Sequence, residues 1–183
     1  MILSAHFDRT WHHGKTPDEM CQLISQVLDN DDLVNSPLNH SPVGLSVWFC
    51  LSEQPHTDEK WTTDNLLRVS VNRETGYGAL VWGVTMKSPR TGGIYESAWI
   101  SDNPEPPASD PKLISDPGYP LFHDWSSAIP LASVRKALEE FCATGTGDRP
   151  ECIQWVRGHF NGQRVDRDPI DDVVDDAEDS SPF

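Results

Sequence analysis

A run of alternating segments between residues 43 and 100 constrains the fold more than any other feature of the sequence. In residues 43–51 the odd positions are aliphatic or aromatic, and the even positions carry Gly44, Ser46, Trp48 and Cys50. Residues 67–71 alternate in the same way, and residues 79–86 follow them after the glycine-containing RETGYG turn. A period of two with glycine turns predicts half-buried strands joined as hairpins. We expect a further strand over residues 94–100, which completes a meander.

Two segments have the helical period instead. Thr16, Pro17 and Glu19 have the spacing of a capping box with proline in the first turn. The apolar residues that follow recur every three or four positions: Met20, Leu23, Ile24, Val27 and Leu28. A second helix is predicted from about Pro130 to a cap at Gly145, with an apolar stripe of Leu131, Val134, Leu138, Phe141 and Cys142. Both are amphipathic, so each needs a sheet face to cover.

The remaining elements are shorter. Residues 1–13 predict an edge hairpin that turns at residues 8–10, residues 121–123 a short strand, and residues 152–156 a last strand. Residues 30–42 are polar and contain two prolines, which indicates a loop. Together these elements predict an α+β fold, a mainly antiparallel β-sheet with two helices packed on one face.

Charge divides the chain into two parts. The sequence has 14 Lys and Arg against 29 Asp and Glu, a formal net charge of -15. Residues 166–183 hold eight of the acids and one base, hence -7, which leaves -8 for residues 1–165. We expect residues 1–165 to be a single domain and residues 166–183 to be an acidic disordered tail. An acidic surface repels phosphate, so the partner is expected to be basic, with no direct nucleic acid and no membrane contact.

The sequence has no pattern typical of a catalytic or cofactor site. The neighbouring His12 and His13 would face opposite sides of a strand, so they would not bind one metal ion. The four cysteines form no CxxC pair and are expected to be buried free thiols of a cytoplasmic protein: Cys21, Cys50, Cys142 and Cys152. We expect no signal peptide, and the sequence contains no apolar stretch of about 20 residues. We therefore expect no enzyme activity, no metal and no cofactor.

Residues 101–119 form the segment with the strongest indication of function. Six prolines up to Pro120 and four acids predict an irregular, rigid surface loop, and long loops in compact domains are often functional. Trp99 leads into this loop; tryptophan is common at interface hot spots, although a place in the core is an equally good interpretation. The predicted partner-binding residues are Tyr77, Trp99, Asp102, Asn103, Glu105, Asp110, Asp116 and Tyr119.

Four strings resemble one known family: RVSVNRETGYGALVW (68–82), WISDNPEPPASDPKLISDPGYPLF (99–122), IPLASVRKALEEFCATGTGDRPECIQW (129–155) and GHFNGQR (158–164). They are similar to the actinobacterial branch of the Imm-one immunity proteins of bacterial polymorphic toxin systems. The resemblance implies an α+β antitoxin that binds and inhibits a cognate toxin, usually a nucleic-acid (cytidine or DNA) deaminase, and has no catalytic activity of its own. It supplies no contact residues, so the residues named above rest on the surface argument.

The leading hypothesis is thus a one-to-one complex with a basic toxin domain, a zinc-dependent deaminase, whose active site or substrate cleft becomes occluded. Two alternatives stay open. An enzyme or small-molecule-binding domain would use a cleft under the proline-rich loop and retain a ligand there. An acidic nucleic-acid mimic would depend on the tail after Arg164.

Overall fold

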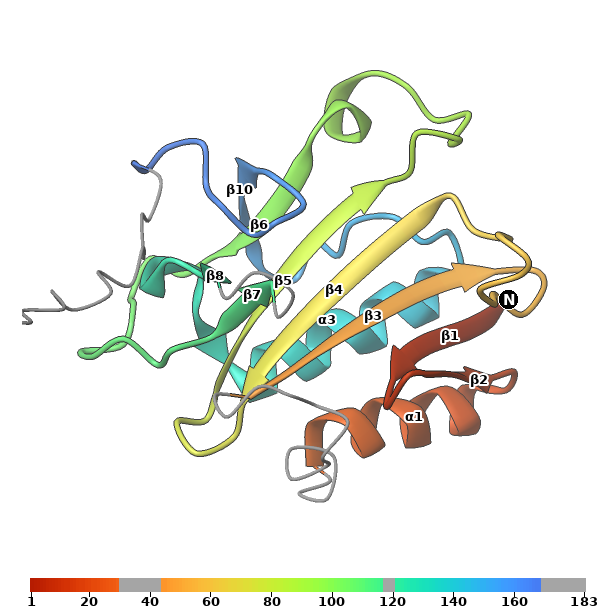
Figure 1. The fold of residues 1–183 in the computed structure, drawn as a ribbon, viewed down its shortest axis with the longest axis horizontal. Coiled ribbons are helices and arrows are strands. Elements are labelled where there is room, and N and C mark those ends of the chain that lie inside the picture. The colour runs from red at the N-terminus through yellow and green to blue at the C-terminus, as the bar shows by residue number, and fades with distance from the viewer. Residues whose placement is uncertain (30–43, 117–120, 169–183) are drawn as a thin grey trace, which may run out of the picture.

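The computed structural model describes residues 1–29, 44–116 and 121–168 of the chain. Within these ranges eight strands form one sheet, and β7 and β8 form a small second sheet. The strands are β1 (Ile2–Phe7), β2 (Thr10–Gly14), β3 (Leu45–Ser52), β4 (Asn65–Asn72), β5 (Tyr77–Val84), β6 (Ala98–Asp102), β7 (Ile114–Asp116), β8 (Leu121–Phe122), β9 (Ile129–Pro130) and β10 (Gln154–Gly158). All their pairings are antiparallel, in the order β10-β6-β5-β4-β3-β1-β2, with β9 beside β5 (Figure 1).

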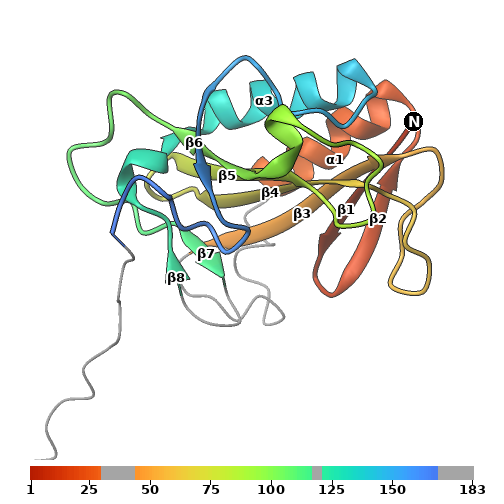
Figure 2. The ribbon, with the colours of Figure 1, turned by 90° about the horizontal axis from the view of Figure 1, so that it is seen from above.

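Helices α1 (Pro17–Asp29) and α3 (Leu131–Thr144) lie side by side on one face of the sheet, whereas β7 and β8 lie on the other (Figure 2). The main core fills the space between helices and sheet, and its largest fully buried side chains include Trp82, Phe49 and Phe141. The predicted α+β fold, with two helices on one face of an antiparallel sheet, is confirmed.

The predicted helix ends are also present. The Glu19 amide donates to Thr16 Oγ1 at 3.2 Å, and Glu19 Oε2 accepts from the Thr16 amide at 3.1 Å, which completes the capping box. At the end of α3, Gly145 takes a left-handed φ of 66°, and its amide donates to the Cys142 carbonyl at 3.2 Å. Local sequence alone therefore sets both boundaries.

The N-terminal hairpin contributes one inner strand and one edge strand to the sheet. Asp8 and Arg9 have φ of 49° and 60°, the two positive values of a tight primed turn between β1 and β2. β1 pairs with β3 on its other side, so it lies inside the sheet and β2 is the edge strand. The expected loop at residues 30–42 lies outside the described residues.

Three predictions about local structure are wrong in part. The strand expected at 94–100 begins later, because Gly92 and Gly93 turn with positive φ into a 3-10 helix, Gly93–Glu96, before β6 starts at Ala98. The loop expected at 101–119 is not wholly irregular. Ser101 and Asp102 belong to β6, and β7 forms after Pro111, where apolar residues are free to pair. Cys21 is exposed rather than buried, since the helical period turns it away from the apolar stripe.

In the described ranges, neither helix is long and apolar enough to cross a bilayer.

Candidate functional site

The outer face of the sheet, opposite the helices, has one row of directly paired residues that changes character along its length. From β2 to β10 the row reads Trp11, His6, Trp48, Arg68, Val81, Ile100 and Val156. We call the outer face from Arg68 of β4 through β5 and β6 to β10 the covered half. The outer face of β1, β2 and β3, with the loop after β3 (53–64) and Leu66, is the open half. Other segments pack over the first, whereas the second contains an aromatic groove.

Two segments pack on the covered half. The proline-rich segment follows β6 and brings Leu113, which is fully buried, against Ala79 and Ala128. The turn after β10 places Phe160 over Gly83, where an added Cβ would lie 2.5 Å from the phenyl ring. An added Cβ at Gly162 (φ 89°) would lie 2.6 Å from Ser115 Cβ and 2.8 Å from the His123 ring, so glycine is required at this contact. These segments form a second layer over half of the sheet.

A buried polar cluster lies beneath this layer. Arg68 is 4% exposed, and its guanidinium lies 5.0 Å from the centre of the Trp48 ring. Burial lowers the pKa of Arg68 to about 10, against the opposing effect of Asp116. His123 Nε2 lies 3.1 Å from Ser70 Oγ; burial, with the nearby Arg68 charge, lowers the pKa of His123 to about 3. His123 is therefore neutral at physiological pH, and Asp116 balances Arg68.

Two of the other predicted acids of the loop also have partners within the chain. Asp102 accepts from Arg164 at 2.7 Å, and Arg164, whose side chain is 4% exposed, also binds Asp166 at 2.9 Å. Asp110 binds Lys112 at 3.1 Å and accepts from its amide at 2.8 Å. Glu105 is exposed. The sequence identified acids in the right loop, but most of them stabilise the loop itself.

The remaining predicted residues lie in several places. Asn103 Nδ2 donates to the Ala128 carbonyl at 2.6 Å, which holds the start of the loop. Tyr77 is half-buried against the Ala79 cluster. Trp99 pairs with Trp82 on the helix side of the sheet, so it points away from the loop into which it leads. Tyr119 lies outside the described residues.

Trp99 is also held by contacts of its own. Its Nε1 donates to the Ile94 carbonyl at 2.7 Å, and the Arg149 guanidinium lies 4.2 Å from its ring centre. It is half-buried and packs against the main core. These contacts support the core interpretation, while a role in partner binding stays a prediction.

The open half holds a groove of about 270 Å³ whose lining is mostly aromatic: His6, Trp11, Trp48, His56, Asp58, Trp61 and Leu66. His56 packs edge-to-face between Trp11 and Trp61, with ring centres 4.6 and 4.7 Å apart. Trp61 is 54% exposed. Trp11 Nε1 donates to Asp58 Oδ1 at 2.8 Å, which fixes a carboxylate at the groove. A cluster of partly exposed tryptophans beside polar groups is typical of protein interfaces.

The groove is preformed because the loop after β3 is anchored to the sheet. His56 is 2% exposed; its amide donates to Ser4 Oγ at 3.2 Å, and its Nδ1 accepts from the Thr62 amide at 3.1 Å. Burial lowers the pKa of His56, which keeps the ring neutral. Thr57 and Lys60 exchange backbone hydrogen bonds of 3.2 Å across the loop tip. A partner therefore meets rings that are already in position.

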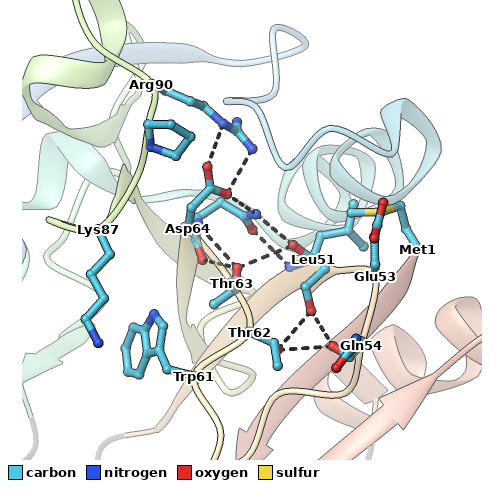
Figure 3. Close-up of a pocket in the computed structure, with 13 residues that line it drawn as sticks. Met1, Leu51, Glu53, Gln54, Trp61, Thr62, Thr63, Asp64, Lys87 and Arg90 are labelled. Atoms are coloured by element: carbon cyan, nitrogen blue, oxygen red, sulfur yellow. Dashed lines mark hydrogen bonds and ion pairs between the residues drawn. The ribbon is translucent and has the colours of Figure 1, made fainter.

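Trp61 also lines a second, larger hollow of about 570 Å³ at the ends of β3 and β4 (Figure 3). There Arg90 points toward Asp64, to which it binds at 2.9 Å, and it also binds Asp148 at 2.7 Å. Asn65 exchanges hydrogen bonds of 2.9 and 2.7 Å with the Leu51 backbone. Arg90 is thus shared by two carboxylates that lie far apart in the sequence. This network holds separate segments together, which leaves the groove as the better candidate site.

Comparison with known proteins decides the family. The model of the family described as immunity protein Imm1 matches residues 14–157, most of the chain. The chain belongs to the Imm1 immunity protein family. Its role is therefore that of an immunity protein, or antitoxin, and its partner is a cognate toxin. No curated protein and no solved structure shows significant similarity to the chain.

Sequence reasoning did not identify the groove of this Imm1 protein as a site. Two signals pointed toward it: Trp48 on the outward side of its strand, and Trp61 within the otherwise polar segment after β3. The groove also includes His6 and Trp11, which precede the residues that match the family model. The strand order that joins these segments was the missing information.

Proposed function

We propose that this Imm1 protein neutralises a basic toxin that acts on nucleic acid, namely a zinc-dependent deaminase, by a one-to-one complex in the cytoplasm. The proposal rests on one observation: a member of an immunity protein family carries a net charge of -15. A deaminase must hold a polyanionic substrate and therefore presents a basic cleft. An acidic protein is steered to such a cleft and excludes the substrate without performing any chemistry.

The outer face of the sheet is the proposed contact surface. Glu105 and Asp110 are exposed on the proline-rich segment and would meet the toxin's basic residues first. The rest of the proposed contact set comprises Tyr77, Asp102, Asn103, Asp116 and Tyr119, together with Trp99, which lies on the helix side of the sheet. A complex tight enough to protect the producing cell needs an interface of roughly 1,200 to 2,000 Å². That area is large enough to include the loop and the neighbouring open half.

Co-expression tests the function most simply. The full chain is produced with the toxin domain encoded beside its gene, and growth, complex stoichiometry and deamination of single-stranded DNA are measured. We expect restored growth, a one-to-one complex in calorimetry and loss of deamination. A chain that binds the toxin but leaves deamination intact would contradict occlusion, and rescue from a toxin without deaminase activity would contradict the proposed toxin class.

A further inference from the structure

We propose that the aromatic groove of the open half is a socket for one arginine or lysine side chain of the toxin. The inference rests on the proposed function, because it names the chemical group by which the toxin would be held. The geometry carries it: three tryptophans and one fixed carboxylate surround a preformed hollow of about 270 Å³.

The rings favour a cation. Indole has the most electron-rich face among the aromatic side chains, and cations within about 6 Å of such a ring are attracted to it. The chain already uses this interaction on the inner side of the groove, where Arg68 lies 5.0 Å from the Trp48 ring centre. Trp11 and Trp61 have no such neighbour among the cation–ring contacts of the described residues, and Trp61 is 54% exposed. The exposed Trp61 ring is therefore available to a cation from outside, whereas the half-buried Trp11, which packs against His6 and His56, offers only the part of its ring that lines the groove.

The carboxylate supplies the complementary charge. Among the described residues that line the groove, Asp58 alone is charged, and its Oδ1 accepts a hydrogen bond from Trp11 Nε1 at 2.8 Å. A carboxylate accepts several hydrogen bonds, so Oδ2 retains capacity for a guanidinium or ammonium donor. The nearest basic residue along the loop, Lys60, directs its Nζ to Gln54 Oε1. Arg68 is 4% exposed and does not line the groove. The negative charge of Asp116, in the covered half, counteracts the positive charge of Arg68.

Other occupants fit less well. An anion would meet Asp58 and the negative ring faces, and the neutral His56 would add no positive charge. A purely apolar side chain would satisfy the rings but would bury the Asp58 carboxylate with no cation and with only the Trp11 indole N–H as a partner, which costs free energy. A basic side chain satisfies both, because its aliphatic stem packs on the rings while its charged end meets the carboxylate.

The first experiment needs no toxin. The full chain is titrated with the peptide acetyl-Gly-Arg-Gly-amide and with its citrulline analogue, which keeps the shape and lacks the charge. The indole N–H signals of Trp11 and Trp61 are followed by NMR. We expect saturable shifts with the arginine peptide and binding at least about threefold weaker with citrulline. Asp58→Asn should reduce this difference, because only the attraction of the rings for a cation then remains. Trp61→Leu should weaken the binding of both peptides.

Equal binding of the two peptides, an unchanged preference in Asp58→Asn, or no shift of either indole would overturn the socket. The matched control is Glu139→Gln, which removes an exposed carboxylate from α3 on the other side of the sheet. This variant should bind both peptides as the wild type does. A normal spectrum of Trp82 in every variant establishes that the fold is intact.

The second experiment separates the socket from the proposed function. Affinity for the toxin domain is measured for the wild type, Asp58→Asn and Glu139→Gln. If the wild type binds the toxin and Asp58→Asn binds equally well, the function stands and the socket does not hold the toxin. If the wild type discriminates arginine from citrulline but binds no deaminase toxin, the proposed function fails while the cation site stands.

Discussion

The covered and open halves of the outer face are built on one continuous sheet, yet they use polar residues in opposite ways. In the covered half Arg68, Arg164 and His123 are buried, and Asp116 and Asp102 act as internal partners of the two arginines. In the open half Asp58 and Trp61 are exposed around a groove. The difference teaches that acidic residues in a surface loop do not by themselves indicate a binding site. Such residues can be needed to hold the loop in place.

This comparison predicts that changes in the covered half affect folding, whereas changes in the open half affect the complex. The largest effect is expected for Gly162→Ala. The residue has φ 89°, and an added Cβ would lie 2.6 Å from Ser115 Cβ and 2.8 Å from the His123 ring. We expect a loss of about 3 kcal/mol or more in the free energy of unfolding, measured by urea denaturation.

Gly76→Ala is the matched control, since Gly76 also has positive φ (77°) but has no atom within 4 Å of its added Cβ. It should lose only about 1 kcal/mol. Equal losses in the two variants would show that packing over the covered half contributes nothing beyond backbone strain.

In the open half, Trp61→Ala should weaken the toxin complex by about 2 kcal/mol, roughly thirtyfold in Kd, because a central tryptophan anchor is lost. Its free energy of unfolding should change by no more than about 0.5 kcal/mol, since the side chain is 54% exposed. Calorimetry and urea denaturation measure the two quantities. A variant that unfolds more easily but binds as the wild type does would reverse the assignment of the halves.

Acid should lower the free energy of unfolding because His123 is buried in the covered half. Its pKa is about 3 in the folded protein and near the ordinary 6.5 when unfolded, so below pH 6.5 the unfolded chain takes up a proton that the folded chain does not. The stabilisation is present above pH 6.5 and is lost as the pH falls toward 3. We expect a loss of about 1.4 kcal/mol for each pH unit below 6.5 from this residue.

Urea denaturation between pH 7 and pH 5 measures this slope, and His123→Gln should flatten it even if the variant is less stable at pH 7. His12, His13 and His56 have pKa values lowered by burial and contribute in the same direction, so a slope remains. A slope that is identical in wild type and variant would contradict a neutral, buried His123.

The smallest effect concerns the exposed acids of the loop. Glu105→Lys with Asp110→Lys should slow association with the basic toxin a fewfold at low salt and reduce its salt dependence. The double variant Asp18→Lys with Glu139→Lys makes the same change in net charge on the helix side. Stopped-flow measurements that give the same association rate for both double variants would show that net charge, and not the outer face, steers the toxin.

Sequence patterns predicted the elements whose causes are local. The Thr16 capping box, the Gly145 cap and the alternation of β3 and β4 depend on neighbouring residues, and the fold follows from them. The site depends on distant pairs. Arg164 reaches Asp102 across 62 positions, and Trp11 reaches Asp58 across 47. Because no local pattern specifies the strand order, the loop's acids could not be assigned as internal partners, and the groove could not be predicted.

Oxidative footprinting of Trp61 in the free chain and in the toxin complex tests most directly whether the open half faces the partner. Trp61 is 54% exposed in the free chain and should oxidise readily, whereas the fully buried Trp82 should not. The account predicts that Trp61 becomes protected when the complex forms. Oxidation of Trp61 at its free rate within a saturated complex would contradict it.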